Sequence, residues 1–399
     1  MGPLAGVKVL ELAHIMSGPT AGMLLADMGA DVIKVEKIPG GDDTRRFSPP
    51  EVNGEASAFL MMNRNKRGVA LDLAHAAGKA ALRRLASAVD VVIENFRVGT
   101  MDKLGLGFDV LRQSNRALIY CAVSGYGLTG PDAHKGGFDL VAQGLSGLMR
   151  ITGERGGAPT KVGSPVTDIN AGILAALGIV SAYVHRLRTG EGQLVDTSLL
   201  EAGVMQTFWQ SAIFLGSGRE IGALGTAHPL TAPYQAFQTE DGWITLGGSN
   251  QVNFERLTRV LEAPELVADP RFADNKARMR NLDALVELLT ERFRRKPSAV
   301  WLAALDAVGV PAGPVLTIAE MLAHPQVRAR DMVVETQHPS VGATEAIGCP
   351  LKFSATPTRV SRPAPRMGEH TREVLMQFGF EAVEIDALIA SGAAVQHPA

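Results

Sequence analysis

The sequence predicts an α/β protein, with a large domain built on a parallel sheet and a smaller α+β domain. Strand-like and helix-like segments alternate over the first hundred residues of the 399-residue chain. A strand, a helix and a second strand recur within about thirty residues, the length of a βαβ unit with parallel strands. After about residue 225 this pattern gives way to a hairpin and helices. Hydrophobic residues make up 46% of the chain, so it can bury a large core.

The first βαβ unit opens the chain. Residues 7–12 (VKVLEL) and 31–36 (DVIKVE) are rich in β-branched residues and are expected to be strands. The helix between them is expected at about 19–28, with Ser17 as its N-cap. Gly29 can close this helix, because glycine readily adopts the left-handed conformation of a C-terminal cap.

The alternation continues along the first domain. Further strands are expected at 69–73, 90–94 and 117–124, with helices at 75–89 and near 101–115. A long helix rich in Gly and Ala is expected at 168–188, ended by Gly190, and its small residues let neighbouring elements approach closely. Its apolar part is shorter than the roughly 18 residues of a membrane span, so we interpret it as a buried helix.

A smaller domain follows. Residues 234–247 alternate apolar and polar positions around Asp241-Gly242, which is typical of a hairpin. Helices are expected near 252–261, 282–294 and 298–308, and residues 309–314 (GVPAGP) break the helical pattern. The expected domains are therefore 1–200 for the first part of the large domain, 225–325 for the small α+β domain, and 335–399 for the C-terminal part that returns to the large domain.

Composition and charge exclude several classes of function. Lys and Arg number 39 and Asp and Glu number 41, so the net charge of -2 provides no basic field for nucleic acid or an anionic membrane. Cys121 and Cys349 are too few for a disulfide framework and suit a reducing compartment. The N-terminus lacks the basic and apolar regions of a secretory signal. We therefore expect a cytoplasmic enzyme.

Basic residues recur near the expected strand ends of the first domain, where open parallel sheets bind ligands. A phosphate-rich ligand needs several cations, supplemented by N–H groups at helix starts. An ordinary solvated surface is the alternative for each single residue, although the run 63–67 (NRNKR) is harder to explain that way. The basic residues are Lys37, Arg45, Arg46, Arg64, Lys66, Arg67, Arg97 and Lys103.

Two acidic residues are candidates for chemistry. Asp168 directly precedes the long apolar helix, so it can be the helix N-cap. It can also be a nucleophilic carboxylate that the positive end of the helix keeps ionised, and the two roles are compatible. Asp139 lies in the glycine-bounded apolar stretch 136–143 (GGFDLVAQ) and is weak evidence by itself.

Other motifs argue against common cofactor chemistry. Residues 125–130 (GYGLTG) fit G-x-G-x-x-G, but loop residues follow where a dinucleotide-binding fold has a helix. The nine histidines show no metal-ligand spacing, and Ser124 is not in a G-x-S-x-G elbow. The loop Gly247, Gly248, Ser249 and Asn250 can offer N–H groups to an oxyanion, or it can be a tight turn with a Ser or Asn cap.

An ordered set of motifs runs along nearly the whole chain. The motifs are 4–12 (LAGVKVLEL), 17–19 (SGP), 25–36 (LADMGADVIKVE), 41–45 (GDDTR), 63–67, 92–96 (VIENF), 125–127, 167–168 (TD), 233–237 (PYQAF), 324–327 (HPQV) and 368–371 (GEHT). With this set the chain resembles CoA-transferase family III, the superfamily of formyl-CoA transferase, carnitine CoA-transferase and α-methylacyl-CoA racemase. Features at 64–67, 225–228 (GTAH) and 308–311 (VGVP) are similar to the branch that exchanges CoA between dicarboxylic acids such as succinate and glutarate.

The resemblance implies a Rossmann-like large domain built from both ends of the chain, a small central domain, and an interlocked homodimer. It places Asp168 at the family's nucleophile. Met16 stands where formyl-CoA transferase has a glutamine, and the family's glycine-rich loop is matched in part by Gly247, Gly248, Ser249 and Asn250. The positions where family members hold CoA are His14, Met16, Lys37, Leu71, Asn95, Phe96, Arg97, Lys103, Gly136, Gly137, Phe138 and Asp139.

The activity that the resemblance implies is transfer of CoA from an acyl-CoA, in this branch succinyl-CoA, to a small carboxylic acid through an aspartyl-CoA thioester. CoA and its thioesters are substrates, and no metal or permanently bound cofactor is needed. The expected partners are small acids and a second copy of the chain, with no nucleic acid and no membrane. Two alternatives are a 2-methylacyl-CoA racemase on the same fold and a catalytically silent acyl-CoA-binding protein. The racemase branch carries a His-Asp pair where this chain has Phe138-Asp139, and Phe cannot act as a general base.

Overall fold

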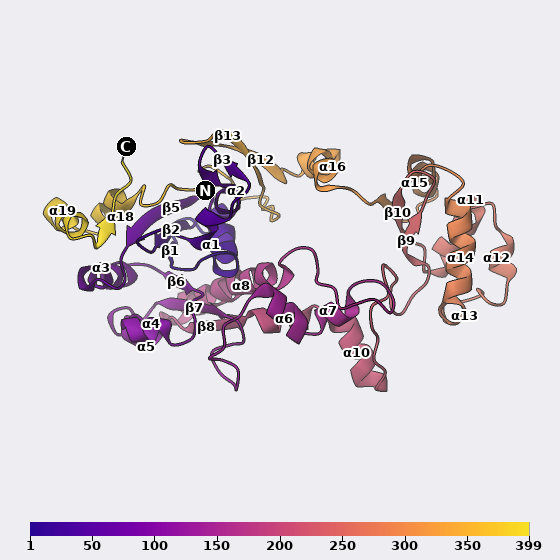
Figure 1. Ribbon diagram of the computed structural model, residues 1–399, viewed down its shortest axis with the longest axis horizontal. Coiled ribbons are helices and arrows are strands. Elements are labelled where there is room, and N and C mark those ends of the chain that lie inside the picture. Colours follow the sequence, from indigo (N-terminus) through magenta and orange to yellow (C-terminus); the bar gives the residue numbers. More distant parts are fainter. Residues whose placement is uncertain (399) are drawn as a thin grey trace. The chain divides into compact units, whose positions relative to one another are not determined.

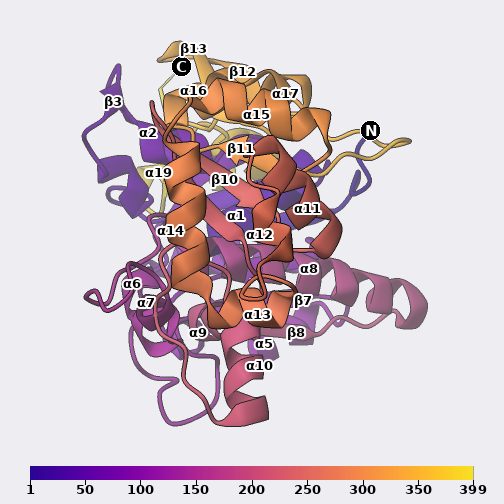
Figure 2. The ribbon, with the colours of Figure 1, turned by 90° about the vertical axis from the view of Figure 1, so that its right-hand side faces the viewer.

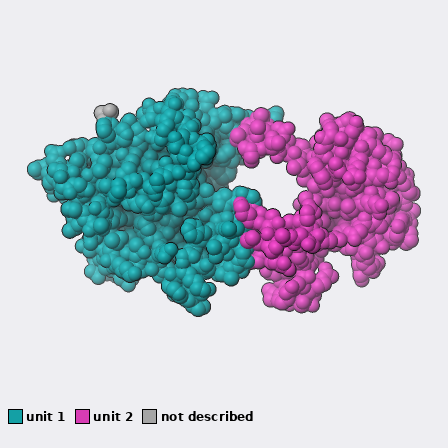
Figure 3. Space-filling model, in the orientation of Figure 1, with its two compact units in different colours: residues 1–146, 163–206, 325–399 teal, residues 147–162, 207–324 magenta. Residues whose placement is uncertain are grey.

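The structure, a computed structural model, describes residues 1–398 and divides into two compact units (Figure 3). Unit 1 contains Met1–Ser146, Gly163–Gln206 and the chain from Pro325 onward. Unit 2 contains Gly147–Val162 and Thr207–His324. Residues 147–162 therefore group with unit 2, whereas the sequence-based boundary places them in the large domain.

Seven strands form the sheet of unit 1, in the order β14-β5-β2-β1-β6-β7-β8 (Figure 1). All neighbouring pairs from β5 to β8 are parallel, and β14 is antiparallel to β5. The mixed α/β class with a large parallel sheet is therefore confirmed. The strands are β1 (Lys8–Glu11), β2 (Asp31–Glu36), β5 (Lys66–Leu71), β6 (Val91–Glu94), β7 (Ile119–Ser124), β8 (Leu194–Ser198) and β14 (Ala394–Val395).

Each face of this sheet carries its own apolar core, because successive strand residues point to opposite faces. Leu10 and Ile33 belong to one core, together with residues of α3, α5, α18 and α19. Val9 and Val32 belong to the other core, which α1 and α8 cover. These helices are α1 (Ser17–Asp27), α3 (Ala76–Ala86), α5 (Phe108–Ser114), α8 (Val166–Thr189), α18 (Thr371–Gln377) and α19 (Ala382–Ala390).

Helix α8 runs for 24 residues, and only one of its faces is buried. Ala171, Ala175 and Ile179 pack into the core, and Gly172 allows α1 to approach so closely that a Cβ there would lie 2.5 Å from the carbonyl oxygen of Ser17. By length and composition alone α8 could cross a membrane. The interpretation of a buried helix applies to one face of α8 only, because four apolar side chains of its other face are exposed: Ile173, Leu177, Val184 and Leu187.

Most expected elements of unit 1 are present with shifted ends, and three details differ. α1 begins at Ser17 itself, with Met16 at the cap and no side-chain cap, so the prediction of Ser17 as N-cap is wrong. The helix expected near 101–115 is split into α4 (Thr100–Leu104) and α5 by Gly105, whose φ is 67°. Strand β8 was not predicted, because its sequence LVDTS carries little apolar signal.

Shorter elements complete unit 1. Two antiparallel pairs, β3 with β4 and β12 with β13, lie outside the main sheet. The elements are η1 (Asp43–Arg46), β3 (Glu51–Val52), β4 (Glu55–Ala56), α2 (Ser57–Met62), α6 (Asp139–Leu145), α9 (Leu199–Met205), α17 (Pro325–Ala329), β12 (Val333–His338) and β13 (Gly342–Ile347).

Unit 2 combines a small antiparallel sheet with helices, which are prominent in Figure 2. The expected hairpin is β9 (Tyr234–Gln238) with β10 (Trp243–Gly247), and β11 (Ala312–Pro314) adds a third strand. Three aromatic side chains lie in its core: the Phe293 ring contacts the Phe237 ring at a tilt and the Trp301 ring edge-on. The helices are α7 (Leu148–Ile151), α10 (Phe208–Ser217), α11 (Gln251–Val260), α12 (Glu265–Ala268), α13 (Asn275–Arg280), α14 (Leu282–Phe293), α15 (Ser298–Ala307) and α16 (Ile318–Ala323).

Candidate active site

A cavity of about 200 Å³ lies in unit 1 at the carboxyl ends of β1, β6 and β7. Ligands of open parallel sheets bind at this edge, because the loops that follow the strands meet there. Residues from these three loops line the cavity, together with Asp168 at the start of α8. Of the residues predicted from the sequence, the cavity brings together His14, Met16, Asn95, Phe96, Arg97, Gly136, Gly137, Phe138 and Asp168.

Asp168 is held in this cavity by the packing of α8 on α1. Gly172 lies one helical turn further along α8 and contacts the first turn of α1, so Asp168 comes beside the loop before α1. α8 begins at Val166, two residues before Asp168, and no side chain of its N-cap residue bonds the helix. Asp139 Oδ1 accepts the N–H of Thr167 at 3.0 Å instead. The interpretation of Asp168 as the N-cap is therefore wrong.

The Asp168 carboxyl is electrostatically unusual. Burial and the nearby negative charge of Asp139 raise its pKa to about 7. Within residues 1–398, no hydrogen-bond donor or cation contacts its carboxylate oxygens. The sequence predicted that the helix end keeps this carboxyl ionised, whereas a pKa of about 7 leaves it only partly ionised at neutral pH, because burial and Asp139 outweigh the helix field. A carboxylate without hydrogen-bond donors is a better nucleophile than a solvated one once it has lost its proton.

The loop after β1 is fixed to the loop after β6 by Asn95. The N–H of His14 donates to Asn95 Oδ1 at 2.8 Å, and Asn95 Nδ2 donates to the carbonyl oxygen of His14 at 2.8 Å. The His14 ring meets the Phe96 ring edge-on, with centroids 5.0 Å apart. Burial and the charge of Lys34 lower the pKa of His14, so its imidazole is neutral at pH 7. These contacts fix the His14 ring against Phe96 and leave it uncharged at this part of the cavity wall.

Two glycines shape the opposite wall. A Cβ on Gly125 would lie 2.6 Å from Gly137 Cα, and a Cβ on Gly137 would lie 2.3 Å from Gly125 Cα. The two backbones therefore touch, which only glycine permits. The pattern G-x-G-x-x-G at 125–130 thus includes a glycine needed for close loop packing, and the loop residues after it agree with the exclusion of a dinucleotide-binding turn.

Most cations of the first domain are engaged in ion pairs within unit 1. The run 63–67 is structural, because Arg64 pairs with Asp27 at 2.6 Å and Lys66 pairs with Glu11 at 2.8 Å. Among the described residues, Arg97 and Lys103 have no carboxylate partner. A sequence cannot reveal this pairing, because the partners lie far apart along it. The other pairs are Arg45–Glu36, Arg46–Asp43, Lys37–Asp43, Arg67–Asp31 and Arg67–Glu373.

Several predicted CoA contacts lie outside this cavity. Leu71, the last residue of β5, is fully buried in the core. Lys37 pairs with Asp43 on the surface, and Lys103 lies on the exposed side of α4. Asp139 does not line the cavity and is hydrogen-bonded to Thr167. Four further residues line the cavity but were not predicted as site residues: Ser17, Ser124, Lys135 and Leu199. Ser17 belongs to the motif 17–19 (SGP), which could have pointed to it.

The predicted substrate loop, Gly247 to Asn250, belongs to unit 2. The N–H of Gly247 donates to the carbonyl oxygen of Pro311 at 2.8 Å, and that of Gly248 to the carbonyl oxygen of Pro233 at 3.0 Å. Asn250 accepts the N–H of Asn253 at 2.8 Å and caps α11. The turn with an Asn cap is therefore the alternative that the structure displays, and the two glycine N–H groups are not available to an oxyanion in this conformation.

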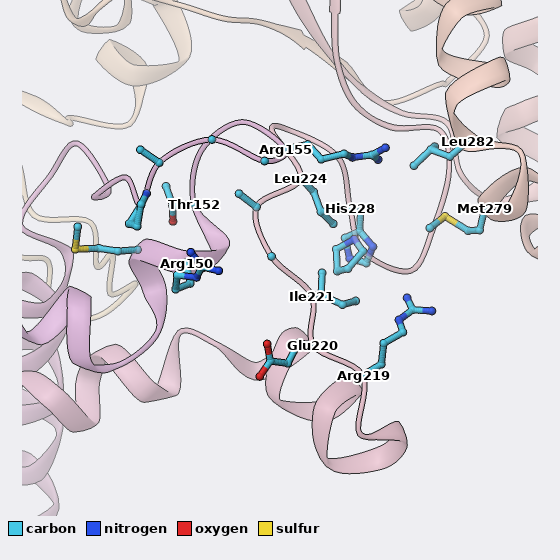
Figure 4. Close-up of a pocket in the computed structure, with 18 residues that line it drawn as sticks. Arg150, Thr152, Arg155, Arg219, Glu220, Ile221, Leu224, His228, Met279 and Leu282 are labelled. Carbon is cyan, nitrogen blue, oxygen red and sulfur yellow. The ribbon is translucent and has the colours of Figure 1, made fainter.

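Unit 2 contains a larger cavity of about 470 Å³ (Figure 4). Arg150, Arg155, Arg219 and His228 line it beside apolar side chains, and the His228 ring contacts the ring of Trp209. It shares no residue with the cavity at Asp168. Over residues 1–398, no group of three or more His, Cys, Asp and Glu side chains is placed to hold a metal ion.

Comparison with known proteins places the chain among the CoA-transferases. The family model described as CoA-transferase family III matches residues 4–371. The succinyl-CoA:glutarate CoA-transferase of Mus musculus is 37% identical over 398 residues, covering 100% of this chain and 91% of that protein. The succinate–glutarate CoA-transferase of Agrobacterium fabrum is 41% identical over 381 residues, covering 94% of this chain and 95% of that protein.

The solved structures agree with the sequence comparisons. A CAIB/BAIF family protein from Brucella suis superposes with a TM-score of 0.85 at 40% identity, covering 94% of this chain and 99% of that one. A Mycobacterium tuberculosis protein superposes with a TM-score of 0.83 at 32% identity, covering 94% of this chain and 99% of its own. The motifs of the sequence, the cavity around an unpartnered aspartate and these full-length similarities lead to one conclusion. The chain belongs to CoA-transferase family III.

Proposed function

We propose that this protein moves CoA from succinyl-CoA to a small dicarboxylic acid, with Asp168 as the nucleophile. The observation that carries the proposal is the position of Asp168, whose carboxylate is half-buried, has no hydrogen-bond donor and faces a cavity at the ligand-binding edge of the sheet. Full-length relatives named succinyl-CoA:glutarate CoA-transferases support the choice of donor and acceptor.

The reaction balances without a metal or an oxidant. The Asp168 carboxylate forms a bond to the thioester carbonyl carbon, and the C–S bond breaks to give a mixed anhydride and CoA thiolate. The thiolate then attacks the Asp168 carbonyl carbon and releases succinate, which leaves an aspartyl-CoA thioester. The acceptor carboxylate repeats these steps in reverse order. Each exchange stays close to thermoneutral provided that water is excluded.

The cavity residues have distinct tasks in this proposal. Arg97 is a cation in the cavity wall without a carboxylate partner, so it can bind a phosphate of CoA or a carboxylate. His14 and Phe96 form the apolar wall beside the thioester. Lys37, Leu71 and Lys103 remain proposed CoA contacts on the family resemblance alone, although Leu71 can offer only its backbone.

We also propose a homodimer of interlocked subunits in which a second copy covers the apolar face of unit 1. The support is an exposed apolar surface on α8 and its neighbours, where Leu177 is 62% and Leu187 is 71% exposed. Monomeric proteins rarely expose contiguous apolar patches of this kind. Further exposed members are Phe138, Leu140, Val141 and Leu145 on or beside α6, and Val204 and Met205 on α9. A cytoplasmic location is proposed as well, and two free buried cysteines support it.

The experiment that tests the function is a mass-spectrometric assay of succinyl-CoA against a panel of carboxylic acids, with wild-type protein and Asp168→Asn. We expect the wild type to form glutaryl-CoA or a related dicarboxylic thioester, and Asp168→Asn to bind CoA yet lose activity by several orders of magnitude. Wild type incubated with succinyl-CoA alone should give a hydroxylamine-sensitive adduct on the peptide containing Asp168. An active Asn variant, or an adduct on Asp139, would reject the assignment.

A further inference from the structure

A buried network of charges lies directly behind the loop that carries His14. Glu11, Lys34 and Lys66 come from three neighbouring strands and are fully buried. Lys34 Nζ lies 3.1 Å from Glu11 Oε1 and 2.8 Å from Asp42 Oδ2, and Lys66 Nζ lies 2.8 Å from Glu11 Oε2. A Cβ on Gly22 would lie 1.7 Å from Glu11 Oε2, so α1 leaves room for the network only because it has glycine there.

This network reaches the cavity through Asp42 and Lys34. Asp42 Oδ1 accepts the N–H of Ile15 at 3.2 Å, and Lys34 Nζ donates to the carbonyl oxygen of Ala13 at 2.9 Å. The two contacts fall on either side of His14. Burial by itself would raise the pKa of Asp42, but the Lys34 charge outweighs it and holds that pKa below its usual range. Asp42 is therefore ionised at every pH at which the protein would work.

The segment held in this way is strained. Ile15 has a φ of 63°, in the left-handed region that a β-branched residue rarely adopts. Such a conformation is energetically unfavourable and persists only where the surroundings hold it. Ile15 lines the cavity together with His14, Met16 and Asp168, so its conformation sets where the neighbouring side chains and N–H groups point.

We propose that Asp42 and Lys34 are positioning residues. They hold Ile15 in its left-handed conformation and thereby align with Asp168 the part of the cavity wall, from His14 to Met16, beside which the thioester would bind. The inference rests on the proposed function, because it assigns a task within that reaction. It extends the functional set to two residues that lie outside the cavity, since neither Asp42 nor Lys34 lines it.

Unit 1 offers a matched control for this proposal. Asp27 and Arg64 form another buried ion pair, with 2.6 Å between Asp27 Oδ2 and Arg64 Nη2. Asn65 Nδ2 also donates to Asp27 Oδ1 at 2.7 Å, so this carboxylate, like that of Asp42, is buried and contacts both a cation and a hydrogen-bond donor. Neither residue of the pair lines the cavity. A purely structural role predicts similar consequences for the loss of either carboxylate, whereas positioning predicts a loss of turnover only for Asp42.

The experiment compares Asp42→Asn with Asp27→Asn in steady-state CoA transfer, CoA binding by calorimetry and thermal unfolding. We expect both variants to lower the melting temperature. Asp42→Asn should lower kcat by about 10-fold to about 100-fold with CoA affinity within about 3-fold of wild type, since a misplacement of about 1 Å can cost up to about 100-fold. Asp27→Asn should keep the wild-type kcat. Unchanged kcat in Asp42→Asn, or an equal loss in both variants, would overturn the proposal.

A milder variant covers the case in which Asp42→Asn does not fold. The Thr44 hydroxyl donates to Asp42 Oδ1 at 2.8 Å, and Thr44→Val removes this bond while keeping the shape of the side chain. We expect kcat to fall by about 2-fold to about 5-fold with unchanged CoA affinity, consistent with the loss of one hydrogen bond. Wild-type kcat in Thr44→Val would count against positioning. Asp168→Asn is measured in parallel, because its activity tests the proposed nucleophile independently of Asp42. Failure of the proposed function and failure of the positioning role are therefore distinguishable.

Discussion

Asp139 Oδ1 accepts two hydrogen bonds from Thr167, one from its N–H at 3.0 Å and one from its hydroxyl at 2.7 Å. Gln143 Nε2 donates to the second carboxylate oxygen at 2.7 Å. Because Thr167 is buried and directly precedes Asp168, these bonds fix the first turn of α8. Asp139 thus orients the proposed nucleophile through the backbone while its charge raises the pKa of that nucleophile.

The rate of CoA transfer should rise with pH through about 7. The Asp168 carboxyl, whose pKa is raised to about 7, must lose its proton before it attacks the thioester, so activity is low below this pH and reaches a plateau above it. The measurement is the pH profile of kcat/KM for succinyl-CoA. Asp139→Asn removes a charge that raises this pKa, so its midpoint should move to lower pH. Asp386→Asn, on the exposed surface of α19, is the control and should leave the midpoint in place. An unchanged midpoint in Asp139→Asn would contradict the conclusion that the charge of Asp139 raises the pKa of Asp168.

Asp168→Asn should stabilise the protein at pH 8 and have little effect near pH 4. The pKa of this carboxyl rises from 3.8 in the unfolded chain to about 7 in the folded protein, so the folded state disfavours the ionised form. Its penalty therefore grows as pH rises from 3.8 to about 7 and stays constant above that. At about 1.4 kcal/mol per pKa unit, it amounts to a few kcal/mol. Melting temperatures at the two pH values check this, and a less stable Asn variant at pH 8 would refute it.

Gly137→Ala should abolish CoA binding while the protein still folds. A methyl group at this position would lie 2.3 Å from Gly125 Cα, so the two loops that wall the cavity must separate. Gly216→Ala adds the same group in α10, where no atom lies within 4 Å, and should bind CoA normally. Calorimetry with CoA distinguishes the two variants. Binding by Gly137→Ala within about twofold of wild type would show that the loop contact does not shape the site.

Arg97→Ala should weaken CoA binding by at least about tenfold, because a charge-assisted contact contributes about 1.5–3 kcal/mol. Lys37→Ala should have a smaller effect, since Lys37 is already paired with Asp43 at 2.8 Å. Arg116→Ala is the matched control, because Arg116 is an exposed residue paired with Glu191 and does not line the cavity. The affinities are measured by calorimetry. Equal CoA affinities of the Arg97 and Arg116 variants would reject Arg97 as the residue that binds an anionic group of CoA.

Leu177→Glu should dissociate the proposed dimer. Its side chain is 62% exposed within the apolar face of α8, so a buried charge there would disfavour association. Val383→Glu introduces the same charge at an isolated exposed position of α19 and should leave the dimer intact. Light scattering at micromolar concentration reports the mass of each variant. A monomeric, active wild type would exclude the dimer altogether.

The sequence predicted the strands and most helices of unit 1 because their signals are local. Residues 31–36 match β2 residue for residue, since β-branched side chains and a following turn define both ends. The family resemblance placed His14 and Asn95 at the CoA site, and in the structure each follows a strand of one parallel sheet and lines the cavity. Loops after parallel strands meet at one edge whatever the details of packing.

What sequence reasoning missed depends on contacts between distant segments. The run 63–67 had the composition of a phosphate site, yet Arg64 is paired with Asp27 and Lys66 with Glu11. The pKa of Asp168 depends on burial and on Asp139, neither of which the local helix signal contains. The hydrogen bonds of Gly247 and Gly248 to proline carbonyls are likewise set by strand packing.

The position of β14 in the main sheet has a consequence for biosynthesis. This strand pairs Ala394 with Leu71, so the outer edge of β5 lacks this hydrogen-bonding partner until β14 has been synthesised. Contacts between chain segments this distant form slowly, because a long loop must close first. An open strand edge is also a template for pairing with another chain. A nascent or shortened polypeptide that lacks β14 therefore presents β5 as an aggregation-prone edge, so β14 protects the chain against aggregation during synthesis.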